Sequence, residues 1–133
     1  FPLFGQVYGM TEAKSLQALR VLIVEDEVLV AMSVKETLER FGCVVVGPVG
    51  RVRRAMELVG AELDAAVLDV NIAGERVFPV AEALTSRGVP VVFTTGYGTD
   101  GIDGVFPSSI VLQKPYLDAT LAEALAKAVG QAL

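Results

Sequence analysis

Acidic side chains stand at the ends of two apolar packets of the sequence. The stretch "VLIVEDE" ends in Glu25, Asp26 and Glu27, and "AAVLD" ends in Asp69. At about 5 Å separation and an effective dielectric of about 20, each like-charged pair costs roughly 3 kcal/mol. Carboxylates that follow a buried strand therefore require a cation that offsets their repulsion, or they must splay into water.

A hard divalent cation suits such a cluster. Mg²⁺ prefers oxygen ligands in octahedral geometry and keeps several waters. Glu25, Asp26 and Asp69 offer carboxylate oxygens, directly or through water, and the backbone carbonyl of Asn71 can complete the set. We therefore expect a Mg²⁺ site here, which Mn²⁺ could also fill.

A hydroxyl and an ammonium extend this constellation. Thr95 lies in "VVFTTGY" and Lys114 in "VLQKPY". A metal-bound carboxylate beside Lys and Thr suits phosphoryl transfer, where positioning and charge neutralisation supply most of the catalysis. Asp69 is the candidate nucleophile, because a carboxylate can form an aspartyl phosphate. Lys114 would neutralise one phosphoryl oxygen and Thr95 would hydrogen-bond another.

The elements that must position these side chains alternate between strands and helices. Such alternation predicts an α/β fold, with helices on both faces of a parallel sheet. A doubly wound, flavodoxin-like sheet of five strands in the order 2-1-3-4-5 would bring the ends of strands one, three, four and five together, where ligands of such sheets bind. The expected strands are 20–24, 44–47, 65–68, 91–94 and 110–113, and the expected helices are 28–41, one from about 52, 77–87 and one from about 117.

One connection departs from this alternation. Residues 96–109, "GYGTDGIDGVFPSS", contain four glycines and a proline and show no helical stripe. Since glycine disfavours helix, we expect the fourth helix to be short or missing and the loop to be mobile. Upstream, Pro48 is expected to end the second strand at Gly47.

Composition limits the classes of function. The chain has 133 residues, 53% of them apolar, which suits one domain with a real core. Its net charge of −5 argues against nucleic acid as the main partner, and the cluster Arg51, Arg53 and Arg54 is interpreted as an exposed helix start or a partner contact. No apolar run is long enough to insert into a membrane. Cys43 is the single cysteine and is expected in the core, and the absence of histidine excludes the usual zinc sites.

Four motifs together resemble the receiver domain of two-component response regulators: "VLIVEDE", "AVLDVN", "VVFTTGY" and "VLQKPY". The resemblance covers residues 20–133. It implies Mg²⁺-dependent phosphorylation of Asp69 by a histidine kinase or histidine phosphotransferase, and a cis peptide between Lys114 and Pro115. It further implies a cytoplasmic signalling domain, monomeric or weakly dimeric, that acts on a downstream protein target. Such a domain is not an enzyme beyond catalysing its own phosphorylation and dephosphorylation.

The chain departs from the usual receiver pattern in several places. Glu25 stands where the first acid is often Asp, and "NIAGERVFP" lacks the common Met-Pro. Val111 occupies the position of the usual switch aromatic, so Tyr97 and Tyr116 are the candidates for a switch or a partner contact, with core packing as the alternative role. The motifs are most similar to stand-alone receivers and those attached to hybrid kinases, mostly alphaproteobacterial.

Other hypotheses stay open at this point. A magnesium-dependent phosphatase with an aspartyl intermediate would want Asp-x-Asp, whereas this chain has Asp69 followed by Asn71. A flavin-binding module would need a phosphate-cradling loop where "EDEV" stands. A receiver fold could also act as a binding scaffold without phosphotransfer.

The first residues of the chain differ in sequence from the rest. We expect Met10 to be the natural start, residues 1–9 to come from an expression vector, 10–19 to form an extension and 20–133 to form the receiver domain. Alternatively, the chain was cut from a longer protein.

Overall fold

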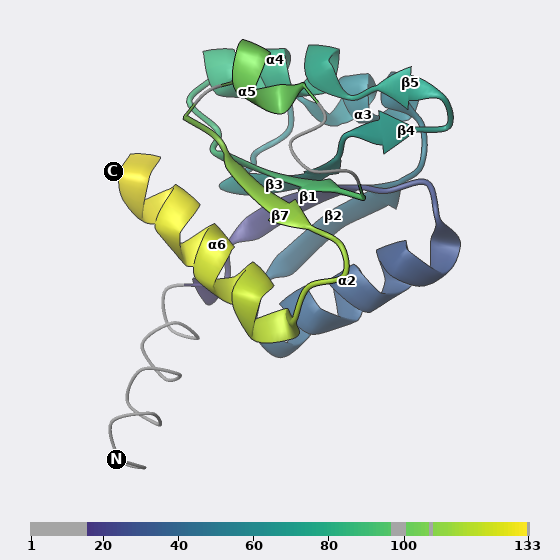
Figure 1. The fold of residues 1–133 in the computed structure, drawn as a ribbon. Coiled ribbons are helices and arrows are strands. Elements are labelled where there is room, and N and C mark those ends of the chain that lie inside the picture. Colours follow the sequence, from purple (N-terminus) through teal and green to yellow (C-terminus); the bar gives the residue numbers. More distant parts are fainter. Residues whose placement is uncertain (1–15, 97–100, 107, 133) are drawn as a thin grey trace, which may run out of the picture.

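A computed structural model gives the fold of residues 16–96, 101–106 and 108–132. A parallel sheet lies between two layers of helices (Figure 1). The expectations for residues 1–15 and for Tyr97 lie outside these described residues. Among the described helices, none is both long and apolar enough to cross a membrane.

The sheet has the predicted order. Its five strands are Arg20–Val24 (β1), Val44–Val49 (β2), Ala65–Asp69 (β3), Val91–Thr95 (β6) and Ile110–Gln113 (β7). They run parallel in the order β2-β1-β3-β6-β7, which confirms the doubly wound order 2-1-3-4-5. The carboxyl ends of β1, β3, β6 and β7 consequently meet at one edge.

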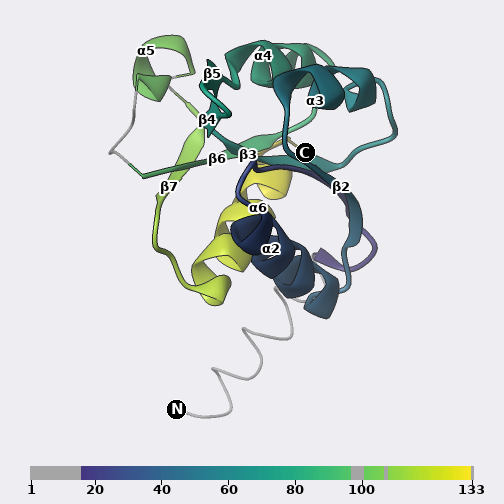
Figure 2. The same cartoon turned by 90° about the vertical axis from the view of Figure 1, so that its right-hand side faces the viewer.

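The helices divide between the two faces of the sheet (Figure 2). One face packs against Val28–Arg40 (α2) and Asp118–Ala132 (α6), and the other against Val52–Leu58 (α3), Phe78–Ser86 (α4) and Ile102–Val105 (α5). The four residues of α5 confirm the expected short helix in the glycine-rich connection.

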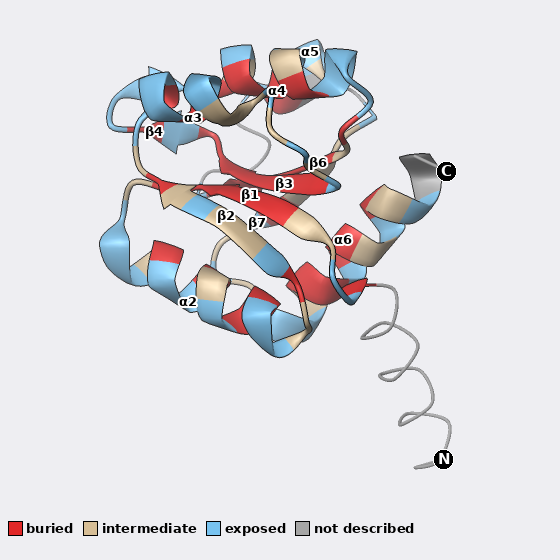
Figure 3. Ribbon diagram, turned by 180° about the vertical axis from the view of Figure 1, so that it is seen from behind, coloured by how far each residue is buried: buried red, intermediate tan, exposed pale blue. Residues whose placement is uncertain are grey.

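The central strands are buried on both sides (Figure 3). Side chains alternate between the faces of a strand, so Leu22 joins the core under α3, α4 and α5, while Ile23 joins the core under α2 and α6. Cys43 lies in the second core as expected, and burial raises the pKa of its thiol to about 11. Leu16, within the segment expected to be an extension, is fully buried in the same core.

The second strand does not end where the sequence predicted. β2 continues through Pro48 to Val49, because it is an edge strand and its register shifts by a bulge opposite β1 between Leu22 and Val24. An edge strand tolerates a proline, which lacks one ladder donor. Gly47 has φ +91°, and a Cβ there would lie 2.9 Å from the backbone nitrogen of Val49. The Gly47–Pro48 peptide is cis.

A short hairpin follows β3 and was missed by the sequence analysis. Asn71–Ile72 (β4) pairs antiparallel with Glu75–Arg76 (β5). The two turn residues, Ala73 and Gly74, have φ values of +50° and +86°, as type I′ hairpin turns require. Such turns usually carry Asn-Gly or Asp-Gly, and alanine at the first position hid the signal.

Candidate functional site

An ammonium group joins two of the predicted carboxylates. Lys114, directly after β7, places its Nζ 2.8 Å from Glu25 Oε1 and 3.0 Å from Asp69 Oδ2. Glu25 follows β1 and Asp69 ends β3, so residues far apart in sequence converge because their strands are neighbours in the sheet. The Lys114–Pro115 peptide is cis, as the receiver resemblance implied.

Three carboxylates form the predicted cluster. Glu25, Asp26 and Asp69 each offer an oxygen, and these oxygens all lie within 4.8 Å of one another. Glu25 and Asp69 are buried, whereas Asp26 is exposed. A hollow of about 410 Å³ opens over this group and is lined by Asp26, Glu27, Asp69, Asn71, Ala73, Gly74, Gly96 and Lys114.

Burial and neighbouring charges have opposite effects on the pKa values of Glu25 and Lys114. Burial raises the pKa of Glu25 to about 7, although hydrogen bonds from Lys114 and from the Glu27 N–H favour its ionised form. Burial by itself would lower the pKa of Lys114, but its bonds to Glu25 and Asp69 outweigh this effect and raise the pKa to about 12. Lys114 therefore stays positively charged at neutral pH, whereas the neighbouring Glu25 carboxyl gains or loses its proton near pH 7.

Asp26 is anchored differently. Its Oδ2 accepts a 2.9 Å hydrogen bond from the backbone N–H of Ala73 at the tip of the β4–β5 hairpin. Burial by itself would raise the pKa of Asp26, but this bond, the other hydrogen bonds to its carboxylate and the nearby charge of Lys114 together lower it. The same bond stabilises Ala73 in a left-handed conformation that a residue with a Cβ rarely adopts. Ala73 therefore contributes to the site through its backbone, which no side-chain motif could reveal.

Thr95 and Asn71 complete the predicted set. Thr95 ends β6 with its side chain buried, and its backbone carbonyl accepts a 2.8 Å bond from the Lys114 N–H. Asn71 lines the hollow two residues after Asp69. Its side-chain Oδ1 accepts a 3.1 Å bond from Nη1 of Arg76, a residue that the sequence analysis did not single out.

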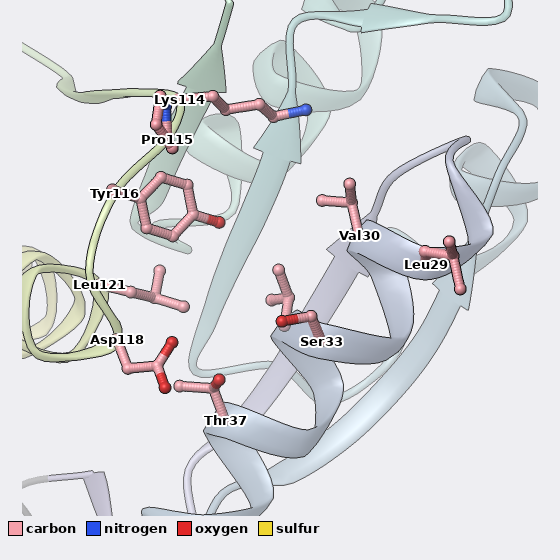
Figure 4. A pocket seen from close by; sticks show the side chains of 10 residues that line it. Leu29, Val30, Ser33, Thr37, Lys114, Pro115, Tyr116, Asp118 and Leu121 are labelled. Atoms are coloured by element: carbon pink, nitrogen blue, oxygen red, sulfur yellow. The ribbon is translucent and has the colours of Figure 1, made fainter.

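Tyr116 lies on the other side of Lys114, in a groove of about 330 Å³ between α2 and the start of α6 (Figure 4). Its ring lies between Pro115 and Leu121, and its hydroxyl is turned toward α2. Burial raises the pKa of this phenol. Leu29, which lines this groove, and Leu117, which follows Tyr116, are exposed. Val28 and Met32 are also exposed, but they line a separate hollow beside Glu25 and Asp26.

Comparisons with known proteins place this geometry in a family. No protein-family model matches the chain. A response regulator receiver protein from Sinorhizobium medicae is 25% identical, superposes with a TM-score of 0.80, and the match covers 89% of this chain and 99% of that one. SdrG from Sphingomonas melonis is 45% identical, with a TM-score of 0.74 and coverage of 84% and 96%. The chain belongs to the receiver domains of response regulators.

A curated relative agrees with this assignment. The transcriptional regulatory protein PdtaR of Mycobacterium tuberculosis is 34% identical over 91 residues, which is 65% of this chain. The match spans only 43% of the length of PdtaR, so this receiver domain corresponds to less than half of that relative. A receiver domain is a signalling domain, and the groups described above stand at its sheet edge.

Proposed function

We propose that this receiver accepts a phosphoryl group on Asp69 from a phosphohistidine of a histidine kinase or histidine phosphotransferase. The observation that carries this proposal is the Lys114 ammonium held between Glu25 and Asp69 within the carboxylate cluster. The arrangement pairs a nucleophilic carboxylate with a fixed positive charge that can receive phosphoryl oxygens.

The reaction exchanges one bond to phosphorus for another. An oxygen of Asp69 attacks phosphorus, the bond from phosphorus to the donor imidazole nitrogen breaks, and its electron pair returns to that nitrogen. Lys114 is 3.0 Å from Asp69 Oδ2 and is positioned to pass from this carboxylate to a phosphoryl oxygen. The high pKa of Lys114 keeps it charged throughout.

The donor set fits a magnesium ion. Hard oxygen ligands are gathered within 4.8 Å, and two of the three carboxylates are buried. Asp26, Asp69 and the Asn71 carbonyl would hold the ion. Both oxygens of Glu25 already accept hydrogen bonds, so Glu25 would act through water. When bound, Mg²⁺ supplies positive charge that neutralises phosphoryl oxygens.

The product would be recognised by Thr95. This residue ends the strand beside β3, and the backbone bond between Thr95 and Lys114 ties the two together. A phosphoryl group adds charge and acceptor oxygens that would draw the Thr95 hydroxyl toward Asp69 and alter the contacts made by α5, β7 and α6. A downstream protein would sense that face, with no role for nucleic acid, and the domain would act in the cytoplasm.

The donor protein would bind beside Lys114. Leu29 at the groove is 85% exposed, and Leu117 beside Tyr116 is 74% exposed. Apolar side chains that rim a groove mark a protein-binding surface. Tyr116 would serve as a partner contact there, because it lies in the same groove.

A generic phosphatase is the weaker reading. Such an enzyme usually carries the acid that protonates the leaving group two residues after its nucleophile, and Asn71, which occupies that position, cannot donate a proton in that way. Lys114 is committed to two carboxylates. The domain would therefore catalyse only its own phosphorylation and dephosphorylation.

The test is the intact mass after incubation with acetyl phosphate, with and without Mg²⁺. We expect a metal-dependent gain of one phosphoryl group, which Asp69→Asn abolishes. Asp64→Asn is the matched control, because Asp64 precedes the same strand at its opposite end and bonds only the backbone of Arg20 among the contacts described. A gain of one phosphoryl group by Asp69→Asn would refute the assignment of Asp69. If the native chain took up no phosphoryl group from any donor, including phosphohistidine proteins, the domain would act as a binding scaffold instead.

A further inference from the structure

Arg76 connects the phosphoacceptor hollow to the opposite side of the β4–β5 hairpin. Its Nη1 lies 3.1 Å from Asn71 Oδ1, in the cross-strand pair that closes the hairpin. Its guanidinium carbon lies 5.2 Å from the centre of the Phe78 ring. Its Nη2 lies 3.3 Å from the place a Cβ would occupy at Gly101, the residue before α5.

These contacts hold the guanidinium on several sides. The guanidinium lies over the Phe78 ring in a favourable cation–π arrangement, and the absent side chain of Gly101 leaves room for the second nitrogen. Phe78 itself packs against Phe93 and Phe106. Arg76 is therefore an exposed residue whose guanidinium contacts Asn71, Phe78 and the start of α5.

The chemistry of the contact orients the amide of Asn71. A guanidinium only donates hydrogen bonds, so the atom it meets must be the amide oxygen. The oxygen consequently points to Arg76, which does not line the hollow, and the NH2 group takes the other edge of the amide plane. Asn71 itself lines the hollow beside Asp69.

We propose that Arg76 is a positioning residue that lengthens the life of the phosphoryl group by holding the side-chain amide oxygen of Asn71, Oδ1, away from attacking water. This inference rests on the proposed phosphorylation of Asp69. In hydrolysis a water oxygen forms a bond to phosphorus, the bond from phosphorus to the Asp69 oxygen breaks with its electron pair returning to the carboxylate, and the water protons leave with inorganic phosphate. An amide oxygen beside the phosphoryl group would accept a hydrogen bond from that water and orient it for attack.

The kinetic test uses Asp69 loaded from acetyl phosphate, freed of donor, and followed by intact mass at saturating Mg²⁺. We expect Arg76→Met to lose the phosphoryl group about three to ten times faster, which is the effect of one ordinary hydrogen bond on a rate. Arg76→Lys keeps a donor but lacks the planar fork, and should fall between. Arg54→Met is the matched control, because Arg54 is exposed on α3, away from the hollow.

A double substitution separates positioning from general destabilisation. If Arg76 acts through the amide, Arg76→Met should have no further effect on lifetime in an Asn71→Ala background. A structural role would shorten the lifetime by the same factor in both backgrounds.

The amide can also be observed directly. Asn71 is the only asparagine in the sequence, so side-chain ¹⁵N-asparagine labelling gives a single NH2 pair. Adding beryllofluoride with Mg²⁺, as a stable phosphoryl analogue, should shift this pair in the native chain and change it differently in Arg76→Met.

The outcomes distinguish the two levels of the argument. If the native chain neither gains mass nor responds to beryllofluoride, the phosphoacceptor proposal fails and this inference fails with it. If the native chain is phosphorylated but Arg76→Met matches Arg54→Met in lifetime, only the role of Arg76 is overturned. A shortened lifetime that persists without Asn71 would also overturn it.

Discussion

The two faces of the sheet are covered in different ways. α2 and α6, with 13 and 15 residues, cover one face, and the core beneath them is built mainly from aliphatic side chains. The other face carries helices of seven, nine and four residues. There Phe78, Phe93 and Phe106 pack with ring centres 5.3 to 6.2 Å apart. On the face with short helices, aromatic side chains therefore provide much of the buried apolar contact.

This difference bears on the response of the molecule. α5 follows Thr95 in the chain and is attached to the sheet by Ile102, which is fully buried, and by Phe106 at its end. A short helix held by two side chains can detach at lower cost than a long one. The short-helix face is therefore expected to open locally, whereas the α2–α6 face stays closed until the domain unfolds.

The largest expected effect comes from the aromatic cluster. Phe93→Ala should lower the free energy of unfolding by about 3–5 kcal/mol, because it leaves a cavity between two rings. Leu125→Ala on the other face should cost about 2–5 kcal/mol. Denaturant unfolding measures both. The comparison fails if Phe93→Ala does not also accelerate hydrogen exchange in α5 more than in α6.

Ile102→Ala should have a smaller global effect. We expect a loss of less than about 2 kcal/mol, below the usual range for a buried isoleucine, because α5 can detach while the rest stays folded. Hydrogen exchange should show α5 unprotected in this variant. Leu121→Ala in α6 is the matched control, and equal losses in both variants would show that the two faces unfold as one unit.

Mg²⁺ and pH should affect stability through the carboxylate cluster at the carboxyl ends of the strands. Since the pKa of Glu25 is about 7 in the folded state and ordinarily 4.5, the folded state binds more protons between these values, and stability without metal falls as pH rises through that window. Mg²⁺ competes with this proton, so its affinity should rise up to about pH 7 and then level off.

Thermal unfolding checks this prediction. Mg²⁺ at about ten times its dissociation constant should stabilise the fold by about 1.4 kcal/mol. Glu25→Gln should remove the pH dependence of metal binding between about pH 5 and 7. The difference in hydrogen exchange between α5 and α6 should persist when Mg²⁺ is bound. If it disappeared, metal binding without phosphorylation would control the local opening of α5.

The smallest expected effect lies on the long-helix face. Arg40 and Asp118 join α2 to α6 at 2.7 Å, but their side chains are 62% and 56% exposed. Arg40→Ala should cost at most about 1 kcal/mol, because exposed ion pairs contribute little. Urea unfolding with and without high salt measures it. A larger loss would mean that ion pairing, rather than the buried apolar stripe, holds these helices together.

Much of the fold could be predicted because it rests on local pattern. Short continuous apolar runs and helical stripes specify strands and helices whatever their partners, and their regular alternation leaves few sheet orders. The convergence of Glu25, Asp69 and Lys114 followed from that order alone. The exception in β2 arose because the tolerance of Pro48 depends on whether its strand lies at an edge, which a strand's own sequence does not state.

The sequence by itself determined the class of fold, the acidic edge and the family resemblance, because each depends on residue type and spacing along the chain. Only the tertiary structure decided that Glu25 is buried and Asp26 exposed, that Ala73 binds Asp26 through its backbone, and that Arg76 turns the amide of Asn71. Burial and hydrogen-bond direction arise from neighbours distant in sequence, and a backbone N–H carries no residue signature.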